Sequence, residues 1–323
     1  MPRKIVHVVA GVEATNGAAV IACALARRQA RAGDAVVVAT TSSAGPRCDT
    51  TGCRLVVYPR TRWPFLRAAC FSAAMLRSLG RLCADADEVF VHCQWTFPVW
   101  WGAKCARGRL VVVPEGSFDP VRLAHGRWKK RLVGFFDRCV LRKAASVWVT
   151  SEREADWVCA YEPRVNGVMR FWPPIEVPAG FTPLARTAGM PLRLLYLGRR
   201  HPLKGLDLLE EAVKGLSVEL RVESSIVGQA KEAAFAWCNV LVLPTRSENF
   251  GLVVTEALAR ARPVIVTEGA PWADVKERGC GWWTAVDAGA LREAIVQAVA
   301  KPEGDLRTMG MRGREWMLSK AAE

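Results

Sequence analysis

The chain has 323 residues and is 51% hydrophobic, so it is long enough for two globular domains and too apolar for a disordered protein. No stretch approaches ~18 uninterrupted apolar residues, which argues against a membrane-spanning helix. The net charge is +14, and residues 1–180 hold 26 Lys and Arg against 14 Asp and Glu. We therefore expect the first half of the chain to meet an acidic surface or a polyanion.

Short Val- and Ile-rich runs alternate with longer segments of helical periodicity in this first half. The apolar run that ends at Ala10 is shorter than the core of a signal peptide, so we interpret it as a buried strand. Six strands are predicted: Ile5–Ala10, Ala35–Ala39, Leu55–Tyr58, Glu88–Cys93, Leu110–Val113 and Val147–Thr150. Continuous apolar strands separated by helices are typical of a parallel sheet that is buried on both faces.

A proline-rich stretch then interrupts this pattern, and the alternation of strands and helices resumes after it. Four more strands are predicted: Leu192–Leu197, Val218–Val222, Val240–Leu243 and Pro263–Thr267. The predicted fold is α/β, with two doubly wound, Rossmann-like parallel-sheet domains that face each other across a cleft. The predicted divisions are a first domain over residues 1–175, a linker over 176–191, a second domain over 192–302, and a last helix over 303–323 that packs back toward the first domain.

Eleven cysteines are scattered along the chain without any Cys-x-x-Cys pair. Free thiols in a reducing cytoplasm explain this distribution better than a disulfide framework does. Asp85-Ala86-Asp87 resembles a metal-binding Asp-x-Asp pair, but it precedes a strand, at the edge opposite to the one where ligands bind. We predict no metal site and no cofactor.

Two loops contain residue types that suit phosphate groups. Asn16-Gly17 follows the first strand, where backbone N–H groups can approach a phosphate, although a simple strand-helix turn explains this sequence equally well. The second loop begins at Gly198 directly after a strand, and its Arg199 and Lys204 suit the oxygens of a diphosphate. The alternative for this second loop is a solvated basic turn.

Two carboxylates, Glu248 and Glu256, stand eight residues apart around a glycine. Glu248 can accept hydrogen bonds from sugar hydroxyls, and Glu256, two turns into a predicted helix, can accept from both hydroxyls of a ribose. The backbone N–H groups between them can face a phosphate or a sugar at the start of the helix. The residues of this segment are Asn249, Phe250, Gly251 and Leu252. Taken alone, the two carboxylates are better explained as a surface acidic pair with a helix-capping role.

Together the last two motifs resemble the retaining GT-B glycosyltransferases of family four, also called group 1, and the resemblance spans nearly the whole chain. Three segments of the first half are similar to motifs of that family: Asn16-Gly17, Val91 to Trp95, and Pro114 to Pro120. Gly279 to Trp283 is similar to a turn in the subgroup that assembles cell-surface polysaccharide and lipopolysaccharide. A GT-B fold and a nucleotide-sugar donor, most commonly a UDP-sugar, are what the resemblance implies.

The resemblance also implies roles for individual residues. Arg199 and Lys204 would hold the donor diphosphate, Glu248 would contact the transferred sugar, and Glu256 would bind the ribose of the nucleotide. His92 is a further catalytic candidate because it ends a predicted strand, although a buried structural histidine is an equal alternative. Glu115 stands where the family usually has a histidine that touches the donor sugar. The remaining donor-binding candidates are Asn16, Gly17, Gly198, Asn249, Phe250, Gly251 and Leu252.

Two basic segments of the first half, residues 60–81 and 121–144, mix Arg and Lys with Trp and Phe. This composition suits the interface of an anionic membrane, while an amphipathic helix on the sheet would bury the same aromatic residues. We expect a packed apolar stripe with a basic rim. The predicted location is the cytoplasm, peripheral to the inner face of the cytoplasmic membrane, and no nucleic-acid partner is expected.

The predicted activity is metal-independent, retaining transfer of a sugar from a nucleotide-sugar to a lipid-linked or lipopolysaccharide-type glycan. Two alternatives stay open from the sequence. A non-catalytic binder of polyanions or membranes would retain the fold and explain the basic half and Glu115. A nucleotide-sugar epimerase would use the same fold without any acceptor.

Overall fold

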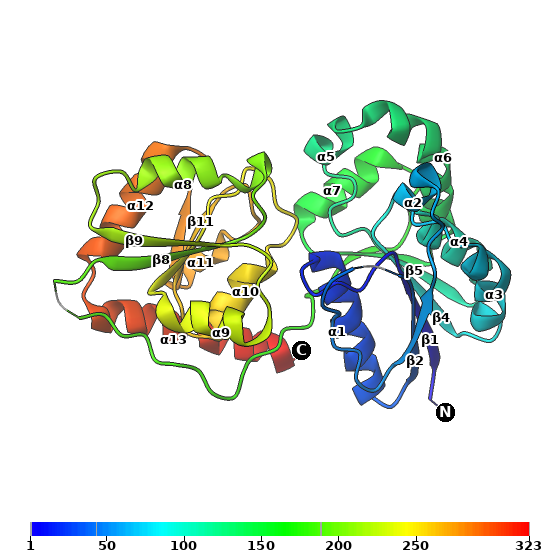
Figure 1. Cartoon of the computed structure of the whole chain (residues 1–323), viewed down its shortest axis with the longest axis horizontal. Coiled ribbons are helices and arrows are strands. Elements are labelled where there is room, and N and C mark those ends of the chain that lie inside the picture. Colours follow the sequence, from blue (N-terminus) through cyan, green and yellow to red (C-terminus); the bar gives the residue numbers. More distant parts are fainter. Residues whose placement is uncertain (1, 43, 188, 323) are drawn as a thin grey trace. The chain divides into compact units, whose positions relative to one another are not determined.

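The computed structural model describes residues 2–42, 44–187 and 189–322. Two compact units divide the chain, Met1–Pro174 and Ile175–Glu323, and each is built around its own sheet (Figure 1). Every strand pair in both sheets is parallel, which confirms the predicted α/β class with two parallel-sheet domains.

The sheet of the first unit has seven strands in the order β3-β2-β1-β4-β5-β6-β7. They are β1 (Lys4–Val9), β2 (Ala35–Thr41), β3 (Arg54–Tyr58), β4 (Glu88–His92), β5 (Arg109–Val113), β6 (Ser146–Val149) and β7 (Val168–Arg170). The first six match the predicted strands within one or two residues. In this order β1 lies beside β4, so the chain reverses its direction of growth between these two strands. Ligands of doubly wound sheets bind where the strand order reverses, at the carboxyl ends of the strands.

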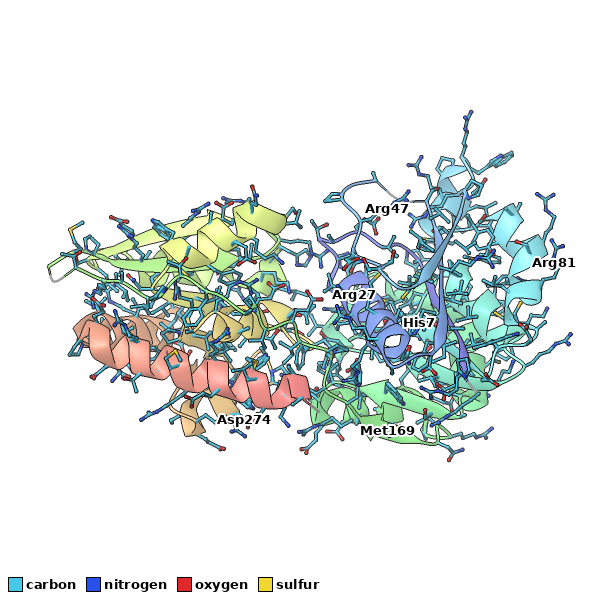
Figure 2. The ribbon with its side chains drawn as sticks, turned by 90° about the horizontal axis from the view of Figure 1, so that it is seen from below. His7, Arg27, Arg47, Arg81, Met169 and Asp274 are labelled. Carbon is cyan, nitrogen blue, oxygen red and sulfur yellow. The ribbon has the colours of Figure 1, made fainter. Side chains whose placement is uncertain are left out.

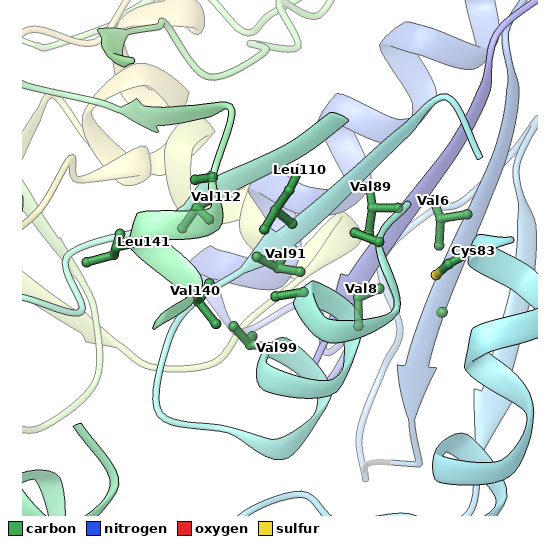
Figure 3. Packing of buried hydrophobic residues seen from close by; sticks show 14 of the residues in the cluster. Val6, Val8, Cys83, Val89, Val91, Val99, Leu110, Val112, Val140 and Leu141 are labelled. Carbon is green, nitrogen blue, oxygen red and sulfur yellow. The ribbon is translucent and has the colours of Figure 1, made fainter. Parts of the chain in front are cut away.

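Helices cover both faces of this sheet. They are α1 (Gly17–Arg31), α2 (Pro64–Ala68), α3 (Ala73–Cys83), α4 (Phe97–Cys105), α5 (Pro120–Ala124), α6 (Arg127–Lys143) and α7 (Glu152–Tyr161). Val8 and Val91 belong to the core under α3, α4 and α6, seen in Figure 3. Ile5 and Phe90 point to the opposite face and pack with α1. Because successive strand residues face opposite sides, burial of both faces favours apolar residues at most positions.

The second unit has a five-stranded sheet in the order β12-β11-β10-β8-β9. Its strands are β8 (Leu192–Leu197), β9 (Val218–Glu223), β10 (Val240–Leu243), β11 (Val264–Thr267) and β12 (Gly281–Thr284). The strand order reverses between β8 and β10, so the loops after these two strands flank the expected ligand position of this unit.

The helical elements of the second unit are the 3₁₀ turn η1 (Pro202–Lys204) and six α-helices. The α-helices are α8 (Leu206–Ala212), α9 (Gly228–Trp237), α10 (Leu252–Ala259), α11 (Asp274–Glu277), α12 (Ala288–Ala300) and α13 (Glu303–Ala322). Leu209 of α8 and Ile295 of α12 pack on the face formed by Leu194 and Val242. Helix α13 packs on α10, and the ring of its Trp316 meets the ring of Trp272 with centroids 5.7 Å apart.

Candidate active site

The loops that follow β8 and β10 bring together a lysine and a glutamate that are 44 residues apart in the sequence. Lys204 Nζ and Glu248 Oε2 form an ion pair, and their side chains are 16% and 13% exposed. Lys204 ends the η1 turn after β8, and Glu248 lies in the loop between β10 and α10. Lys204, predicted to hold the diphosphate, and Glu248, predicted to contact the sugar, therefore lie side by side in a partly buried place at the strand-order reversal.

Backbone hydrogen bonds hold these two loops against each other. Arg246 donates its N–H to the carbonyl of Leu203 over 2.8 Å. Gly205 has a φ of +66°, and a Cβ there would lie 1.8 Å from the carbonyl oxygen of Pro244. Only glycine allows the β8 loop to approach the β10 loop this closely, which explains the glycine that follows Lys204.

The segment after Glu248 leads directly into α10. Gly251 precedes the helix with a φ of +86°, so it supplies the left-handed turn that reverses the chain. The Phe250 side chain is 5% exposed, and its carbonyl accepts a hydrogen bond from the Trp272 indole. Asn249 donates its backbone N–H to Glu248 Oε1 over 3.2 Å. The segment from Asn249 to Leu252 is thus a fixed corner beside the ion pair.

The second carboxylate of the motif, Glu256, lies on α10 and has a partner that the sequence did not reveal. Lys231 of α9 places Nζ 2.9 Å from Glu256 Oε1. Helix α9 follows β9 and so begins at the same sheet edge as α10. Lys231 in the first turn of α9 was the one sign of this contact in the sequence. Its distance of 25 positions from Glu256 meant that the sequence did not reveal the pairing.

Arg199 and Arg200 follow β8 directly, and both are exposed. The carbonyl of Arg199 accepts a hydrogen bond from the Tyr196 hydroxyl over 3.0 Å. Tyr196 is completely buried, and burial raises its pKa to about 12, so the hydroxyl keeps its proton and anchors the loop. Gly198 begins this loop, and its N–H donates to the backbone carbonyl of Glu223 in β9.

The first unit contains a second cluster, at the reversal between β1 and β4. His7 of β1 and His92 of β4 are both completely buried, and His7 Nδ1 lies 2.9 Å from His92 Nε2. His92 Nδ1 lies 3.0 Å from Glu115 Oε1 in the loop after β5. At the other end, His7 Nε2 lies 2.6 Å from Oε1 of Gln29 on α1. Figure 2 shows His7 in the first unit near the ribbon of helix α1.

Burial determines the charge of this cluster. It lowers the pKa of His7 to about 4, and it lowers the pKa of His92 well below its usual value, with His7 adding to the effect. Burial also raises the pKa of the Glu115 carboxyl well above its usual value, and Cys93 and Glu154 add to the rise. His92 and Glu115 are thus brought together as predicted site residues, but both are closed off in this unit, at 0% and 6% exposure.

The loops around His92 and Glu115 are held in an uncommon backbone conformation. Cys93, Trp95 and Glu115 have φ values of +62°, +70° and +54°, a region that non-glycine residues rarely adopt. Two buried carboxylates that the sequence analysis missed anchor them: Asp137 of α6 accepts the Trp95 N–H over 3.1 Å, and Glu154 of α7 accepts the Gly116 N–H over 2.6 Å. Such strain persists only where the surroundings fix it, and it concentrates at functional sites.

The other polar candidates have local structural roles. The Asn16 side chain accepts the Ala18 N–H over 3.2 Å and caps α1, and Gly17 is the first residue of that helix. Asp85 forms an ion pair with Lys4, and Asp87 accepts the Lys4 N–H over 2.7 Å, so the Asp-x-Asp pair fixes the start of β1. Within the described residues, no three His, Cys, Asp or Glu side chains are grouped in a way that could hold a metal ion.

Comparison with known proteins follows the same division of the chain. Residues 16–174 match the family model of the glycosyl transferase 4-like domain, and residues 225–301 match the model of the glycosyl transferases group 1. The chain belongs to the group 1 glycosyltransferases. In sequence, this glycosyltransferase is 30% identical over 94 residues to alpha-1,3/1,6-mannosyltransferase alg2 of Schizosaccharomyces pombe, over 29% of this chain and 19% of that protein. The chain spans less than half the length of the curated relatives it matches.

Solved structures share the fold of this glycosyltransferase over nearly its whole length. Anabaena Alr3699/HepE, in complex with UDP and glucose, has a TM-score of 0.74 at 13% identity and covers 99% of this chain and 97% of its own. WaaG, a glycosyltransferase involved in lipopolysaccharide biosynthesis, has a TM-score of 0.74 at 15% identity, over 98% of this chain and 95% of its own. At these identities the likeness confirms the predicted GT-B fold.

The two basic segments of this glycosyltransferase expose aromatic residues. On and beside α2, Trp63 and Phe65 are 75% and 80% exposed, and on α6 Trp128, Leu132 and Phe135 are 64%, 72% and 66% exposed. The predicted apolar stripe of α6 is packed only in the second half of the helix, where Val140 and Leu141 are buried and the Phe136 ring lies 5.3 Å from that of Trp100, so the expectation for the first half was wrong. Figure 2 shows Arg81, at the end of the first segment, pointing outward.

A pocket of about 550 Å³ adjoins α2 in the first unit. Arg60, Arg62 and Arg67 line it, together with Glu13, Ser42, Ala44 and Thr61. Arg60 donates to Thr41 Oγ1 and to the Ala10 carbonyl, each over 2.7 Å, which fixes its guanidinium at the carboxyl ends of β1 and β2. Among the described residues, none of the three arginines forms an ion pair. No helix in the described part of the chain has the length and apolar content needed to cross a membrane.

Proposed function

We propose that this protein transfers a sugar from a UDP-sugar to a lipid-linked or lipopolysaccharide-type glycan, with retention of anomeric configuration and without a metal ion. The observation that carries the proposal is the pairing of Lys204 with Glu248 at the strand-order reversal of the second unit. The UDP complex of HepE and the described role of WaaG support the donor base and the acceptor class.

The Lys204–Glu248 ion pair suits a site that binds an anion and a sugar together. When a diphosphate enters, Lys204 exchanges one anionic partner for another, so the charge stays neutralised. Glu248 is then available to accept hydrogen bonds from hydroxyls of the transferred sugar. Arg199, exposed after β8, adds a second cation for the charge that grows on the leaving diphosphate. Each well-placed donor contributes about 2.7–4 kcal/mol to such a transition state, which is why we propose catalysis without a metal.

Glu256 is proposed to bind the ribose. Its Oε1 is engaged by Lys231, which fixes the orientation of the carboxylate, and a ribose hydroxyl can approach its other oxygen. The Glu256 side chain is 26% exposed, so a ligand can reach the carboxylate while the ion pair with Lys231 limits its rotation. In this arrangement Lys231 is a positioning residue for the nucleotide.

Donor binding is tested with a panel of nucleotide-sugars in EDTA, measured as the rise in melting temperature of the full chain. A UDP-sugar is expected to give the largest rise, and Glu256→Ala is expected to reduce that rise strongly. Glu210→Ala removes an exposed carboxylate on α8 and is the matched control, with the rise retained. No rise with any nucleotide-sugar would support the non-catalytic binder instead.

Retention and the epimerase alternative are tested in one experiment. The best donor is incubated with a lipid-linked glycan fraction in EDTA, and the products are followed by NMR. A new glycosidic bond with the anomeric configuration of the donor is expected. An inverted product, or a strict requirement for Mg²⁺ or Mn²⁺, contradicts the proposal, and epimerised donor formed without acceptor identifies an epimerase.

The acceptor is proposed from the first unit. The pocket lined by Arg60, Arg62 and Arg67 suits a phosphate or diphosphate, because one guanidinium group can donate two parallel hydrogen bonds to phosphate oxygens. Arg67 belongs to α2, beside the exposed Trp63 and Phe65, so the anionic group and an apolar chain would be met by one segment. Aromatic residues and arginines in this combination favour the interface of an anionic membrane.

Sedimentation with vesicles tests the membrane part. Vesicles with 30% anionic lipid are expected to pull down the wild type, and neutral vesicles to pull down far less. The double variant Trp63→Ser/Phe65→Ser is expected to lose most of this binding, whereas Val296→Ser, which changes an exposed residue on α12, is the control. Equal binding of neutral and anionic vesicles would contradict the electrostatic part of the proposal.

A further inference from the structure

Four polar side chains form a continuous hydrogen-bonded chain inside the first unit. Gln29 Oε1 lies 2.6 Å from His7 Nε2, His7 Nδ1 lies 2.9 Å from His92 Nε2, and His92 Nδ1 lies 3.0 Å from Glu115 Oε1. Both imidazoles have 0% exposure, and Phe90 stacks on the His7 ring with centroids 4.7 Å apart. All four ring nitrogens are therefore engaged within the chain, and solvent does not reach the rings.

The amide oxygen at one end determines where every proton lies. An amide oxygen only accepts, so with this oxygen facing the ring His7 Nε2 would carry the proton and His7 Nδ1 would be an acceptor. His92 Nε2 must then donate to His7, which leaves His92 Nδ1 as an acceptor. The remaining donor is Glu115, whose Oε1 must carry a proton for the last contact to be a hydrogen bond. In this arrangement all four groups are neutral, as complete burial favours.

We propose that Gln29 sets the direction of this hydrogen-bond chain through His7, and that Glu115 is thereby held as a neutral carboxylic acid. Gln29 and His7 are then positioning residues, since they act on Glu115 through His92. The proposal rests on the proposed function only where it gives Glu115 a role in sugar transfer. The charge state of Glu115 is a separate property, and it is measured without any donor or acceptor.

The surroundings of Glu115 agree with a neutral group. Glu154 is a second carboxyl near Glu115, while Arg122 is the nearby cation and His92 is the hydrogen-bond partner. Arg122 donates to the Glu115 carbonyl oxygen over 3.5 Å rather than to its carboxyl. Among the described residues, Glu115 Oε2 is buried without a hydrogen-bond partner, which is a far smaller penalty for the carbonyl oxygen of an acid than for a carboxylate.

A neutral acid cannot act as a base at neutral pH, and it cannot stabilise positive charge on a sugar as a carboxylate would. It can donate one hydrogen bond and accept another. Toward a substrate, Glu115 would therefore offer a hydrogen bond and not a negative charge.

Rotation of the Gln29 amide would produce the opposite chain. The amide NH₂ would donate to His7 Nε2, each imidazole would carry its proton on Nδ1, and His92 would donate to Glu115, which would then be free to ionise. The two arrangements thus differ in the tautomer of both histidines, and only the first requires a proton on Glu115 Oε1. This difference can be observed directly.

The first test is nitrogen-15 NMR on the full chain with labelled histidine at pH 7.5, with His7→Gln and His92→Gln used to assign the signals. Both buried histidines are expected to carry their proton on Nε2. Protons on Nδ1, or a charged imidazolium, would overturn the proposal. Gln29→Glu keeps an acceptor and is expected to retain the Nε2–H tautomers, whereas Gln29→Leu is expected to yield a mixture of both tautomers.

The second test compares the melting temperatures of wild type and Glu115→Gln across pH. In the unfolded chain Glu115 ionises near its ordinary pKa, so a neutral Glu115 costs the wild type stability as the pH rises above ~4.5. The Gln variant is expected to melt at least about 4 °C higher than the wild type at pH 8, with the gap closing toward pH 5. A variant that melts lower than the wild type at pH 8 shows an ionised Glu115 and contradicts the proposal.

The NMR and melting experiments test the charge state of Glu115 independently of the proposed sugar transfer. If the tautomers and the pH dependence are as expected but no donor binds, the proposed function fails and the charge state of Glu115 stands. If a donor binds and the tautomers are reversed, this inference fails and the proposed function stands.

Discussion

Lys231 Nζ lies 2.9 Å from Glu256 Oε1, so the carboxylate that we propose for ribose binding already has a cation from the neighbouring helix as its partner. The two side chains are 21% and 26% exposed, and the pair joins α9 to α10 near the sheet edge where the donor is expected. A partly buried pair with good geometry holds both groups in one orientation. We therefore treat Lys231 and Glu256 as one unit in the predictions below.

Removing either member of this pair is expected to weaken UDP binding by different amounts. Glu256→Ala loses the hydrogen bonds of a charged acceptor, each worth about 1.5–3 kcal/mol, so the Kd for UDP should rise by about 10- to 100-fold. Lys231→Met loses only the orientation of Glu256, so we expect a rise of less than about tenfold. Isothermal titration calorimetry measures both. A larger loss from Lys231→Met than from Glu256→Ala would show that Lys231 contacts the nucleotide itself.

Lys204→Met is expected to lower kcat by about 10²- to 10³-fold, because it removes a cation from the leaving diphosphate. The value of KM should change much less if this interaction strengthens in the transition state. Lys214→Met is the matched control, since that lysine forms an exposed ion pair with Glu211. Steady-state kinetics in EDTA provide the measurement, and a kcat within threefold of the wild type would remove Lys204 from the proposed mechanism.

Gly205→Ala is expected to destabilise the second unit and abolish donor binding. The new Cβ would lie 1.8 Å from the Pro244 carbonyl at a φ of +66°, so the loops that carry Lys204 and Glu248 must separate. Overpacking and a left-handed backbone each cost about 1–3 kcal/mol. Gly304→Ala is the control, because no atom lies within 4 Å of its Cβ and alanine favours a helix. Urea denaturation and UDP titration should separate the two variants, and equal stability would refute the close approach.

The stability of the first unit should depend on the pH through Asp137. Burial raises the pKa of this carboxyl from 3.8 to about 6. The folded state therefore holds its proton more tightly, and the stability that this contributes is complete below pH ~4 and lost as the pH rises through ~6. The loss amounts to about 3 kcal/mol for a shift of about two pKa units.

Asp137→Asn keeps an acceptor for the Trp95 N–H and removes this ionisation. We expect the variant to be about 2–3 kcal/mol more stable than the wild type at pH 7.5, and no more stable near pH 4. Urea unfolding at both pH values is the measurement. A difference that does not depend on pH would show that Asp137 does not titrate in this range.

The sequence predicted the interior strands well because burial of both faces leaves little choice of residue. The bounds of β8 and β10 agree with the prediction exactly at both ends. The two strands that were missed lie at sheet edges: β7 is half exposed and only three residues long, and β12 lies within a segment interpreted as a turn. The other two edge strands, β3 and β9, were predicted because they contain apolar or alternating runs within five and six residues, whereas β7 and β12 have only three and four residues.

The candidate site was only partly accessible from the sequence. Glu248 and Lys204 could be named from motifs, but His7 and Gln29 could not, because a polar residue within a buried strand or helix has no periodic signature. His7 and His92 are 85 residues apart, and they meet only because β1 and β4 pair with Val9 opposite His92. Lys231 was also missed because its partner, Glu256, is distant in the sequence and lies on another helix.

Calorimetric titration of UDP into the full chain in EDTA tests the central claim most directly, with wild type, Glu256→Ala and Glu210→Ala compared under identical conditions. The account predicts saturable binding at one site by the wild type and by Glu210→Ala, and a Kd raised at least about tenfold in Glu256→Ala. Binding that is absent in the wild type, or equal in all three proteins, would contradict a nucleotide-sugar site at Lys204, Glu248 and Glu256.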